Sequence, residues 1–355
     1  MKRAIRLFLT FVVALAAYAL AEYQAVHWVV EHPLPEITDI QIAFGDVPST
    51  PYRDSAYWSP AFLDEVRVSF QDWIWHGNDN YMTRSDMAGK WINFRDGIRV
   101  TRGQSKDATR TIWMIGNSAL IGHELPDQYT IPSQLQALVG TQANVVNLGM
   151  AGANTSQALA RLHSLDLHKG DIVLLMSGAP ESTDIFFEAD RQRGAKLSDG
   201  LCNLIYWRTK SFVVQWACHD TMLQTPPGLL DERLQAYTAE SLEFYTRTVT
   251  QIAAYTHDKD VTFVNILQPH PYRESLSPDD VINIGHRAGV EIAFRSFYAS
   301  VPAKLVTLNL ADVVPSTYFF NSAHVNEHGT ALIAKAIYDM AIMPLQRREL
   351  GQSEF

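Results

Sequence analysis

The stretch TIWMIGNSALIG at residues 111–122 joins a short apolar run to a turn bounded by two glycines. Apolar runs of this length that end in Gly-x-Ser are typical of buried strands in a parallel sheet. A serine one residue beyond such a glycine presents its hydroxyl at the edge of the sheet and keeps its main-chain N–H free to donate. A turn with a helix-capping serine has the same pattern, so Ser118 is a candidate nucleophile that needs partners elsewhere in the chain.

Further apolar runs follow this one and alternate with amphipathic stretches, which is typical of strand–helix–strand units and a parallel sheet. Strands are expected at residues 111–115, 144–148, 171–176, 261–267 and 305–308, and helices at 133–139, 156–164, 232–256, 286–298 and 327–340. In open α/β sheets, ligands bind beyond the carboxyl ends of the strands. The chemistry is therefore expected just after each strand.

The chain is expected to have one main domain with additions. That domain covers residues 109–345 and carries an insertion at about 181–227, between the third strand and its helix. Residues 31–108 are rich in proline and aromatic residues and are expected to form an irregular segment that wraps the domain.

The first 30 residues have the layout of an export signal. Three basic residues precede an apolar run at Leu7–Ala21. Ala19-Leu20-Ala21 has the form of a cleavage site, whereas apolar residues continue past Glu22, which suits an uncleaved membrane anchor. We favour the anchor, with secretion after cleavage near Ala21 as the alternative. Either way the body of the protein is expected outside the cytoplasm, facing the periplasm or the cell exterior.

Composition restricts the partners. The formal net charge of -9 argues against nucleic acid, which is bound through clustered Lys and Arg. Cys202 and Cys218 form a disulfide in an oxidising compartment or remain two buried thiols, and both readings stay open. No histidine spacing predicts a metal site.

Two more blocks bear on the chemistry. Asn147-Leu148-Gly149-Met150-Ala151-Gly152-Ala153-Asn154 follows the second strand, and its glycines let the backbone approach a ligand with unpaired N–H groups. Near the C-terminus, Asn321 precedes His324 by three residues, in a loop before a helix. A side-chain acceptor at that spacing can hold the imidazole while its other nitrogen faces a nucleophile.

In the order and spacing of these blocks, the chain resembles the SGNH, or GDSL-like, hydrolases. The resemblance covers roughly Arg110 to Ile342 and includes the third-strand block that begins at Gly178. Residues 127–132 (DQYTIP) and 155–157 (TSQ) further resemble polysaccharide-associated members of this group. The resemblance implies a three-layer α/β/α, flavodoxin-like domain with a central five-stranded parallel sheet.

The resemblance also implies acyl-ester chemistry at named residues. Ser118 is expected to be the nucleophile, His324 the general base, and the N–H groups of Ser118 and Gly149 the oxyanion donors. No metal or organic cofactor is expected.

Two positions depart from the family pattern. Asn321 stands where the family has the triad Asp, and its amide can accept from the imidazole but carries no charge; such an exchange lowers kcat about 10⁴-fold in a serine protease. Pro180 stands where the family has an oxyanion-donating Asn, a loss that costs about 3–4 kcal/mol unless another donor, Asn154 or Asn117 among them, replaces it.

The sequence thus predicts an extracytoplasmic serine esterase or O-acyltransferase. Its partners are expected to be an acylated polysaccharide, with acetyl as the acyl group, or a small acyl ester, together with the membrane and a polysaccharide synthesis machinery. The alternative is a catalytically degenerate SGNH domain that binds glycan or scaffolds a synthesis or export complex. A thioesterase or lipid esterase is the remaining class.

Overall fold

The computed structural model of the chain describes residues 55–77, 80–191, 227–273 and 290–349. The chain divides into two compact units, residues 1–38 with 187–234 and residues 39–186 with 235–355, and the fold given below is that of the second. The predicted export segment, both cysteines and most of the predicted insertion lie outside the described residues. Within the described ranges, no helix is both long enough and apolar enough to cross a bilayer.

The centre of the fold is a mostly parallel sheet. Its parallel strands lie in the order β10-β9-β8-β6-β7. They are β6 (Thr111–Gly116), β7 (Asn144–Gly149), β8 (Ile172–Ser177), β9 (Thr262–Leu267) and β10 (Leu308–Asn309). All six residues of β8 are buried, as expected for a central strand covered on both faces. The α/β fold class with a central parallel sheet is confirmed.

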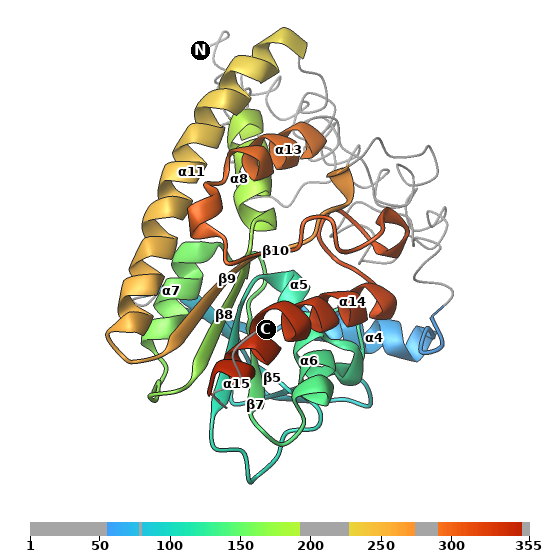
Figure 1. The fold of residues 1–355 in the computed structure, drawn as a ribbon. Helices are drawn as coiled ribbons and strands as arrows, with labels where there is room; N and C mark the ends of the chain where they lie inside the picture. Colours follow the sequence, from blue (N-terminus) through green and yellow to red (C-terminus); the bar gives the residue numbers. More distant parts are fainter. Residues whose placement is uncertain (1–54, 78–79, 192–226, 274–289, 350–355) are drawn as a thin grey trace, which may run out of the picture. The chain divides into compact units, whose positions relative to one another are not determined.

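Helices cover both faces of this sheet. Figure 1 shows α6 and α14 on one side and α7 and α11 on the other. The helices that follow β6 are α5 (Ser118–Ile121), α6 (Ile131–Val139), α7 (Thr155–His163), α8 (Ala179–Arg191), α11 (Pro227–His257), α13 (Val290–Ser300), α14 (Glu327–Ile337) and α15 (Met343–Glu349). Short 3₁₀ turns occupy Asp127–Tyr129, Pro271–Arg273, Ala303–Leu305 and Ser316–Tyr318, and one π turn occupies Tyr338–Ile342.

The segment before residue 109 is more regular than expected. It contains α4 (Pro60–Ser69) and a hairpin of β1 (Trp73–His76) with β2 (Tyr81–Arg84). It also contributes β3 (Met87–Ala88), β4 (Asn93–Arg95) and β5 (Ile98–Arg99), which extend the main sheet beyond β7 in antiparallel fashion. The described sheet therefore has eight strands, where five were expected. Strands of two or three residues are too short to show a period-two pattern in the sequence.

The turn after β6 lies directly against the end of β7. A Cβ atom added to Gly149 would come within 2.5 Å of the main-chain nitrogen of Ile121 and 3.0 Å of the carbonyl oxygen of Asn117. Any side chain at residue 149 would therefore push α5 away from the sheet. This close contact explains the glycine at the end of β7 and fixes α5, with Ser118 at its start, to the edge of the sheet.

Candidate active site

Ser118 is the first residue of α5. The side-chain oxygen of Asn117 accepts a hydrogen bond from the N–H of Ala119 at 2.9 Å and so caps this short helix. Ser118 is half-buried, and its own N–H donates no hydrogen bond within the described part of the chain. The strand-turn-helix geometry expected for an exposed nucleophile is present.

His324 faces the Ser118 hydroxyl. Its Nε2 atom lies 2.8 Å from Ser118 Oγ, although the two residues are 206 positions apart in the chain. The loop that carries His324 is held on both sides: the N–H of Phe320 donates to the carbonyl of His324 at 2.8 Å, and the Asn326 side chain caps the start of α14. The structure thus brings the predicted nucleophile and the predicted base into hydrogen-bonding contact.

Glu124 lies on the other side of the same imidazole. Its Oε1 atom is 2.8 Å from His324 Nδ1, and the two side chains are only 4% and 6% exposed. An ionised carboxylate has no proton to give, so the proton between them belongs to Nδ1. Nε2 then presents a lone pair to the Ser118 hydroxyl, which is the tautomer that a general base requires.

Asn321 also contacts the ring, but in a different role from the expected one. Its oxygen accepts hydrogen bonds from the N–H groups of Ala323 at 3.0 Å and His324 at 2.9 Å. The side-chain nitrogen is therefore the atom that faces His324 Nδ1, at 3.1 Å. Asn321 builds the loop, and the acceptor expected of it is supplied by Glu124.

The sequence reasoning missed Glu124. The predicted partner of the imidazole was the residue three positions before the histidine. The acid that contacts the ring instead follows the nucleophile by six positions, in the turn after α5. A signal was present: Glu124 is a carboxylate in an apolar turn between Gly122 and Pro126, where burial demands a charged or hydrogen-bonded partner.

The predicted oxyanion donors differ in their availability. The N–H of Gly149 donates to the side-chain oxygen of Asn147 at 3.0 Å, so the expectation of an unpaired group there is not met. Asn147 in turn donates to the carbonyl of Leu120 at 2.9 Å and links β7 to α5. Of the two predicted main-chain donors, only the N–H of Ser118 is unpaired in the described residues.

Asn154 was expected to replace the missing donor at Pro180. Its oxygen accepts from the N–H groups of Ser156 at 3.1 Å and Gln157 at 3.4 Å in a capping box that starts α7. This arrangement makes the Asn154 oxygen a helix cap, and no contact joins the residue to Ser118 or His324 in the described structure. The cap occupies the oxygen and not the side-chain nitrogen, so donation from Asn154 to the oxyanion stays a prediction.

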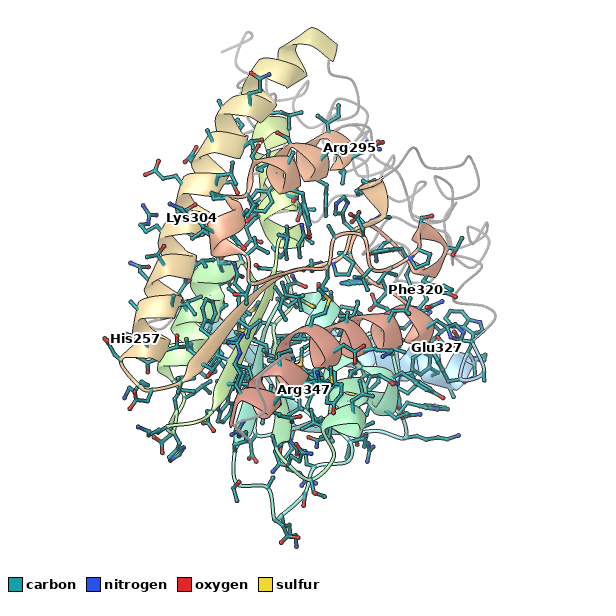
Figure 2. All side chains as sticks on the ribbon, in the orientation of Figure 1. His257, Arg295, Lys304, Phe320, Glu327 and Arg347 are labelled. Carbon is teal, nitrogen blue, oxygen red and sulfur yellow. The ribbon has the colours of Figure 1, made fainter. Side chains whose placement is uncertain are left out.

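Residues from the N-terminal segment reach the helix that follows the His324 loop. Glu327, labelled in Figure 2 at the start of α14, accepts hydrogen bonds at 3.0 Å from the hydroxyls of both Ser55 and Tyr57. Burial raises the pKa of Tyr57 above its ordinary value, and the charges of Glu327 and Glu124 raise it further. Tyr57 is therefore a protonated donor beside two carboxylates.

Comparisons with known proteins find matches among solved structures but none among family models or curated proteins. No model of a protein family matches the sequence. No curated protein matches it either. Solved structures do match, among them phospholipase A1 from Streptomyces albidoflavus NA297 (TM-score 0.41, 13% identity, 66% of this chain and 100% of that one) and a carbohydrate acetylesterase family member from Sinorhizobium meliloti (TM-score 0.39, 12% identity, 68% and 100%).

An extracellular lipase from Streptomyces rimosus matches similarly, with a TM-score of 0.40, 14% identity and coverage of 66% of this chain and 100% of that one. At these TM-scores and identities the matches carry no argument about this chain, so its fold is taken from its own sheet and the chemistry proposed below depends on the geometry of the site.

Within the described residues, no group of three or more His, Cys, Asp or Glu side chains is placed to hold a metal ion.

Proposed function

We propose that this protein is a serine esterase of the SGNH type in which Ser118, His324 and Glu124 form the catalytic triad. One observation carries the proposal: two consecutive contacts of 2.8 Å join Ser118 Oγ to His324 Nε2 and His324 Nδ1 to Glu124 Oε1. A hydroxyl, an imidazole and a buried carboxylate in this order are what nucleophilic attack on an ester carbonyl needs.

The reaction proceeds in two halves. Ser118 Oγ attacks the carbonyl carbon as its proton passes to His324 Nε2, and Glu124 stabilises the imidazolium that forms. The oxyanion faces the unpaired N–H of Ser118. The tetrahedral intermediate collapses when the imidazolium gives its proton to the departing alkoxide, which leaves an acyl-serine. A water molecule, or an acceptor hydroxyl, then attacks with His324 again as base and releases the acid or a new ester.

Glu124 also affects the choice between an enzyme and a binding domain. The degenerate-domain alternative rested partly on Asn321, because a neutral partner stabilises an imidazolium poorly. A buried carboxylate at 2.8 Å from Nδ1 removes that ground. Pro180 still lacks the oxyanion donor that the family has at this position, and this favours a slow enzyme.

For the substrate we propose short acyl esters, acetyl foremost, on a polysaccharide outside the cytoplasm, with the acyl group passed to water or to an acceptor hydroxyl. The basic and apolar N-terminal sequence supports the location, and the negative net charge disfavours a phosphate-rich substrate. The polysaccharide-associated motifs at residues 127–132 and 155–157 support the substrate class, although Asp127 and Thr155 are buried framework residues.

The test is labelling and turnover by the full-length protein. We expect a fluorophosphonate probe to label the wild type and a chromogenic acetyl ester to be hydrolysed. Ser118→Ala should lose the label and lower kcat about 10⁶-fold, to background. Ser164→Ala, which removes an exposed hydroxyl at the end of α7, is the matched control and should behave as the wild type.

An unlabelled and inactive wild type would refute the esterase and favour the glycan-binding scaffold. Equal labelling of Ser118→Ala would instead show that another residue is the nucleophile. Acetate release from an acetylated polysaccharide, compared with transfer of the label to an unacetylated one, distinguishes hydrolysis from transfer.

A further inference from the structure

We propose that Arg99, which belongs to the segment before the main domain, is a positioning residue that holds Glu124 against His324. The importance of this role for catalysis rests on the proposed function. Its structural basis does not, because it consists of contacts between Arg99 and the turn that carries Glu124.

Glu124 lies on a tight turn at the end of α5. Gly122 ends the helix with φ +66°, in the left-handed region that glycine adopts without strain, and the N–H of Leu125 donates to the carbonyl of Gly122 at 3.1 Å. Gly122 and Leu125 are thus the ends of a four-residue turn, and Glu124 is its third residue. Its side-chain direction depends on how those two ends are held.

Arg99 contacts both ends of this turn. One terminal nitrogen of its guanidinium donates to the carbonyl of Leu125 at 2.7 Å, and the other approaches the carbonyl of Gly122 at 3.4 Å. Arg99 is itself completely buried. A planar guanidinium with donors on both sides can hold two carbonyls at a fixed separation, which the single ammonium of a lysine cannot do.

Asp127 holds the guanidinium in place. Its Oδ1 atom accepts from Arg99 Nε at 2.9 Å and from the N–H of Asn93 at 3.0 Å. Its Oδ2 atom accepts from Asn93 Nδ2 and from Arg102, both at 2.8 Å. With both carboxylate oxygens occupied and side-chain exposure of 0% for Arg99 and Asp127, this network is rigid.

His123, the neighbour of Glu124 in this turn, is also held by the segment before residue 109. Its ring is buried, stacks on Phe70 with centroids 4.1 Å apart, and lies 3.1 Å from Ser69 Oγ through Nδ1. Phe70 and Ser69 also belong to the segment before residue 109. That segment therefore contacts the turn through His123 and through Arg99, and in the described part of the chain it is Arg99 whose side chain donates to the main-chain carbonyls on either side of Glu124 in sequence.

Loss of the Arg99 contacts should change two measurable quantities, the pKa of His324 and kcat. A carboxylate near the imidazole favours the protonated ring, so a displaced Glu124 lowers the pKa of His324 and lowers kcat. In the described residues, the charged or titratable groups that interact with this pair are Arg99 and Tyr57 with Glu124 and His123 with His324, and Glu327 lies beside Tyr57. Deleting Arg99 alone would remove a positive charge and shift the His324 pKa the opposite way, so the informative variant must keep the net charge.

The experiment uses Arg99→Met/Asp127→Asn, which removes one positive and one negative charge together. We expect kcat on a chromogenic acetyl ester to fall about 10²-fold, the loss typical of a catalytic group displaced by about 1 Å, with little change in KM. The acidic limb of kcat/KM and the His324 pKa, followed by NMR of labelled histidine rings, should both move to lower pH, as in Glu124→Gln. Arg99→Lys keeps the positive charge but lacks the paired donors of the guanidinium. Its kcat and its His324 pKa should lie between those of this variant and those of the wild type.

Arg102→Met is the matched control, because Arg102 binds the same carboxylate and is half-exposed but makes no contact with the turn. We expect its kcat and its His324 pKa to match the wild type. In a Glu124→Gln background, Arg99→Met/Asp127→Asn should have no further effect on kcat.

An unchanged His324 pKa in folded Arg99→Met/Asp127→Asn, or a full additional loss of kcat in the Glu124→Gln background, would overturn the positioning role. A purely structural role would lower the free energy of unfolding without moving the pKa. The ring titration does not require turnover, so an inactive wild type whose His324 pKa still falls in the variant would refute the esterase and support the positioning role.

Discussion

Two short segments bring a polar side chain to Nδ1 of the same imidazole, and they differ in how that side chain is held. In the loop 321–324, the oxygen of Asn321 is bonded to N–H groups of its own loop. In the turn 122–125, Glu124 directs its carboxylate to His324 while its main chain is held by Arg99. The first segment is organised by neighbours in sequence and the second by a distant part of the fold.

This difference shows why a spacing motif can identify a position and miss its chemistry. A side chain three residues before a histidine will lie near the ring in a tight loop whether or not it serves as the acceptor. The acceptor must instead be the group with a free oxygen at Nδ1, and that is decided by tertiary contacts.

Among variants of these two segments, the largest effect is expected for Glu124→Gln. Its amide can donate to Nδ1 and so favour the tautomer whose Nε2 carries the proton, which cannot act as a base. We expect kcat on an acetyl ester to fall about 10⁴-fold, as when the acid of a serine protease triad is made an amide. KM should change little, because Glu124 is buried behind the histidine.

Glu65→Gln is the matched control for this substitution. Its carboxylate accepts from the N–H groups of Lys90, Trp91 and Ile92 and touches none of the triad residues. It should lower the free energy of unfolding and leave kcat of the folded protein unchanged. A similar loss of kcat in both variants would assign the effect of Glu124→Gln to general destabilisation.

The double variant Glu124→Gln/Asn321→Asp sharpens the comparison by moving the charge from one segment to the other. An Asp at residue 321 can keep one oxygen on the N–H groups of Ala323 and His324 and place the other where the amide nitrogen now lies, 3.1 Å from Nδ1. We expect kcat to recover about 10- to 100-fold relative to Glu124→Gln alone, since an opposite charge at that distance stabilises the imidazolium. No recovery would mean that this position cannot serve as the acid in this loop.

A smaller effect concerns His123 and stability. Burial lowers the pKa of His123 well below its ordinary value near 6.5, and the charge of Arg99 adds to the shift. The Ser69 hydroxyl donates to the carbonyl of Val66, so Nδ1 of His123 carries a proton and donates to Ser69. The lowered pKa keeps the ring neutral, without a second proton on Nε2.

As the pH falls below about 6.5, His123 binds a proton in the unfolded chain but not in the folded protein. The free energy of unfolding should therefore decrease by up to about 1.4 kcal/mol per pH unit from this residue. Urea unfolding of the wild type and of His123→Phe at pH 7 and pH 5.5 would measure it. Parallel pH dependences in the two proteins would contradict the assignment.

The core of the fold could be predicted because its strands are long enough to show their pattern. The run that became β6 was expected at residues 111–115 and spans Thr111–Gly116, and the helix expected at 133–139 spans Ile131–Val139. The last strand was expected at 305–308 but lies at Leu308–Asn309, because residues 303–305 form a 3₁₀ turn. Strands β3 to β5 could not be predicted, since they are held by pairing with one another and, through β5, with β7, and not by a local pattern.

The site divides in the same way. Ser118 and His324 follow from motifs at the ends of a strand and before a helix. Glu124 could not be derived from spacing, because its partner is 200 residues away in sequence. The expected N–H donor at Gly149 is occupied by Asn147, a residue of the same motif, so the pattern that suggested an open donor also contains the group that occupies it.

Ser118 and His324 are 206 residues apart in the chain, whereas Arg99 is fewer than 30 residues from Asp127 and Leu125, its partners around Glu124. Contacts of high sequence separation form late in folding because closing a long loop costs more chain entropy. The acid turn can thus assemble from an early part of the nascent chain, whereas the nucleophile remains without a base until α14 has docked. On the proposed function, a partly synthesised chain therefore has no complete Ser118–His324 pair, and the appearance of esterase activity during refolding would report the docking of the last helices.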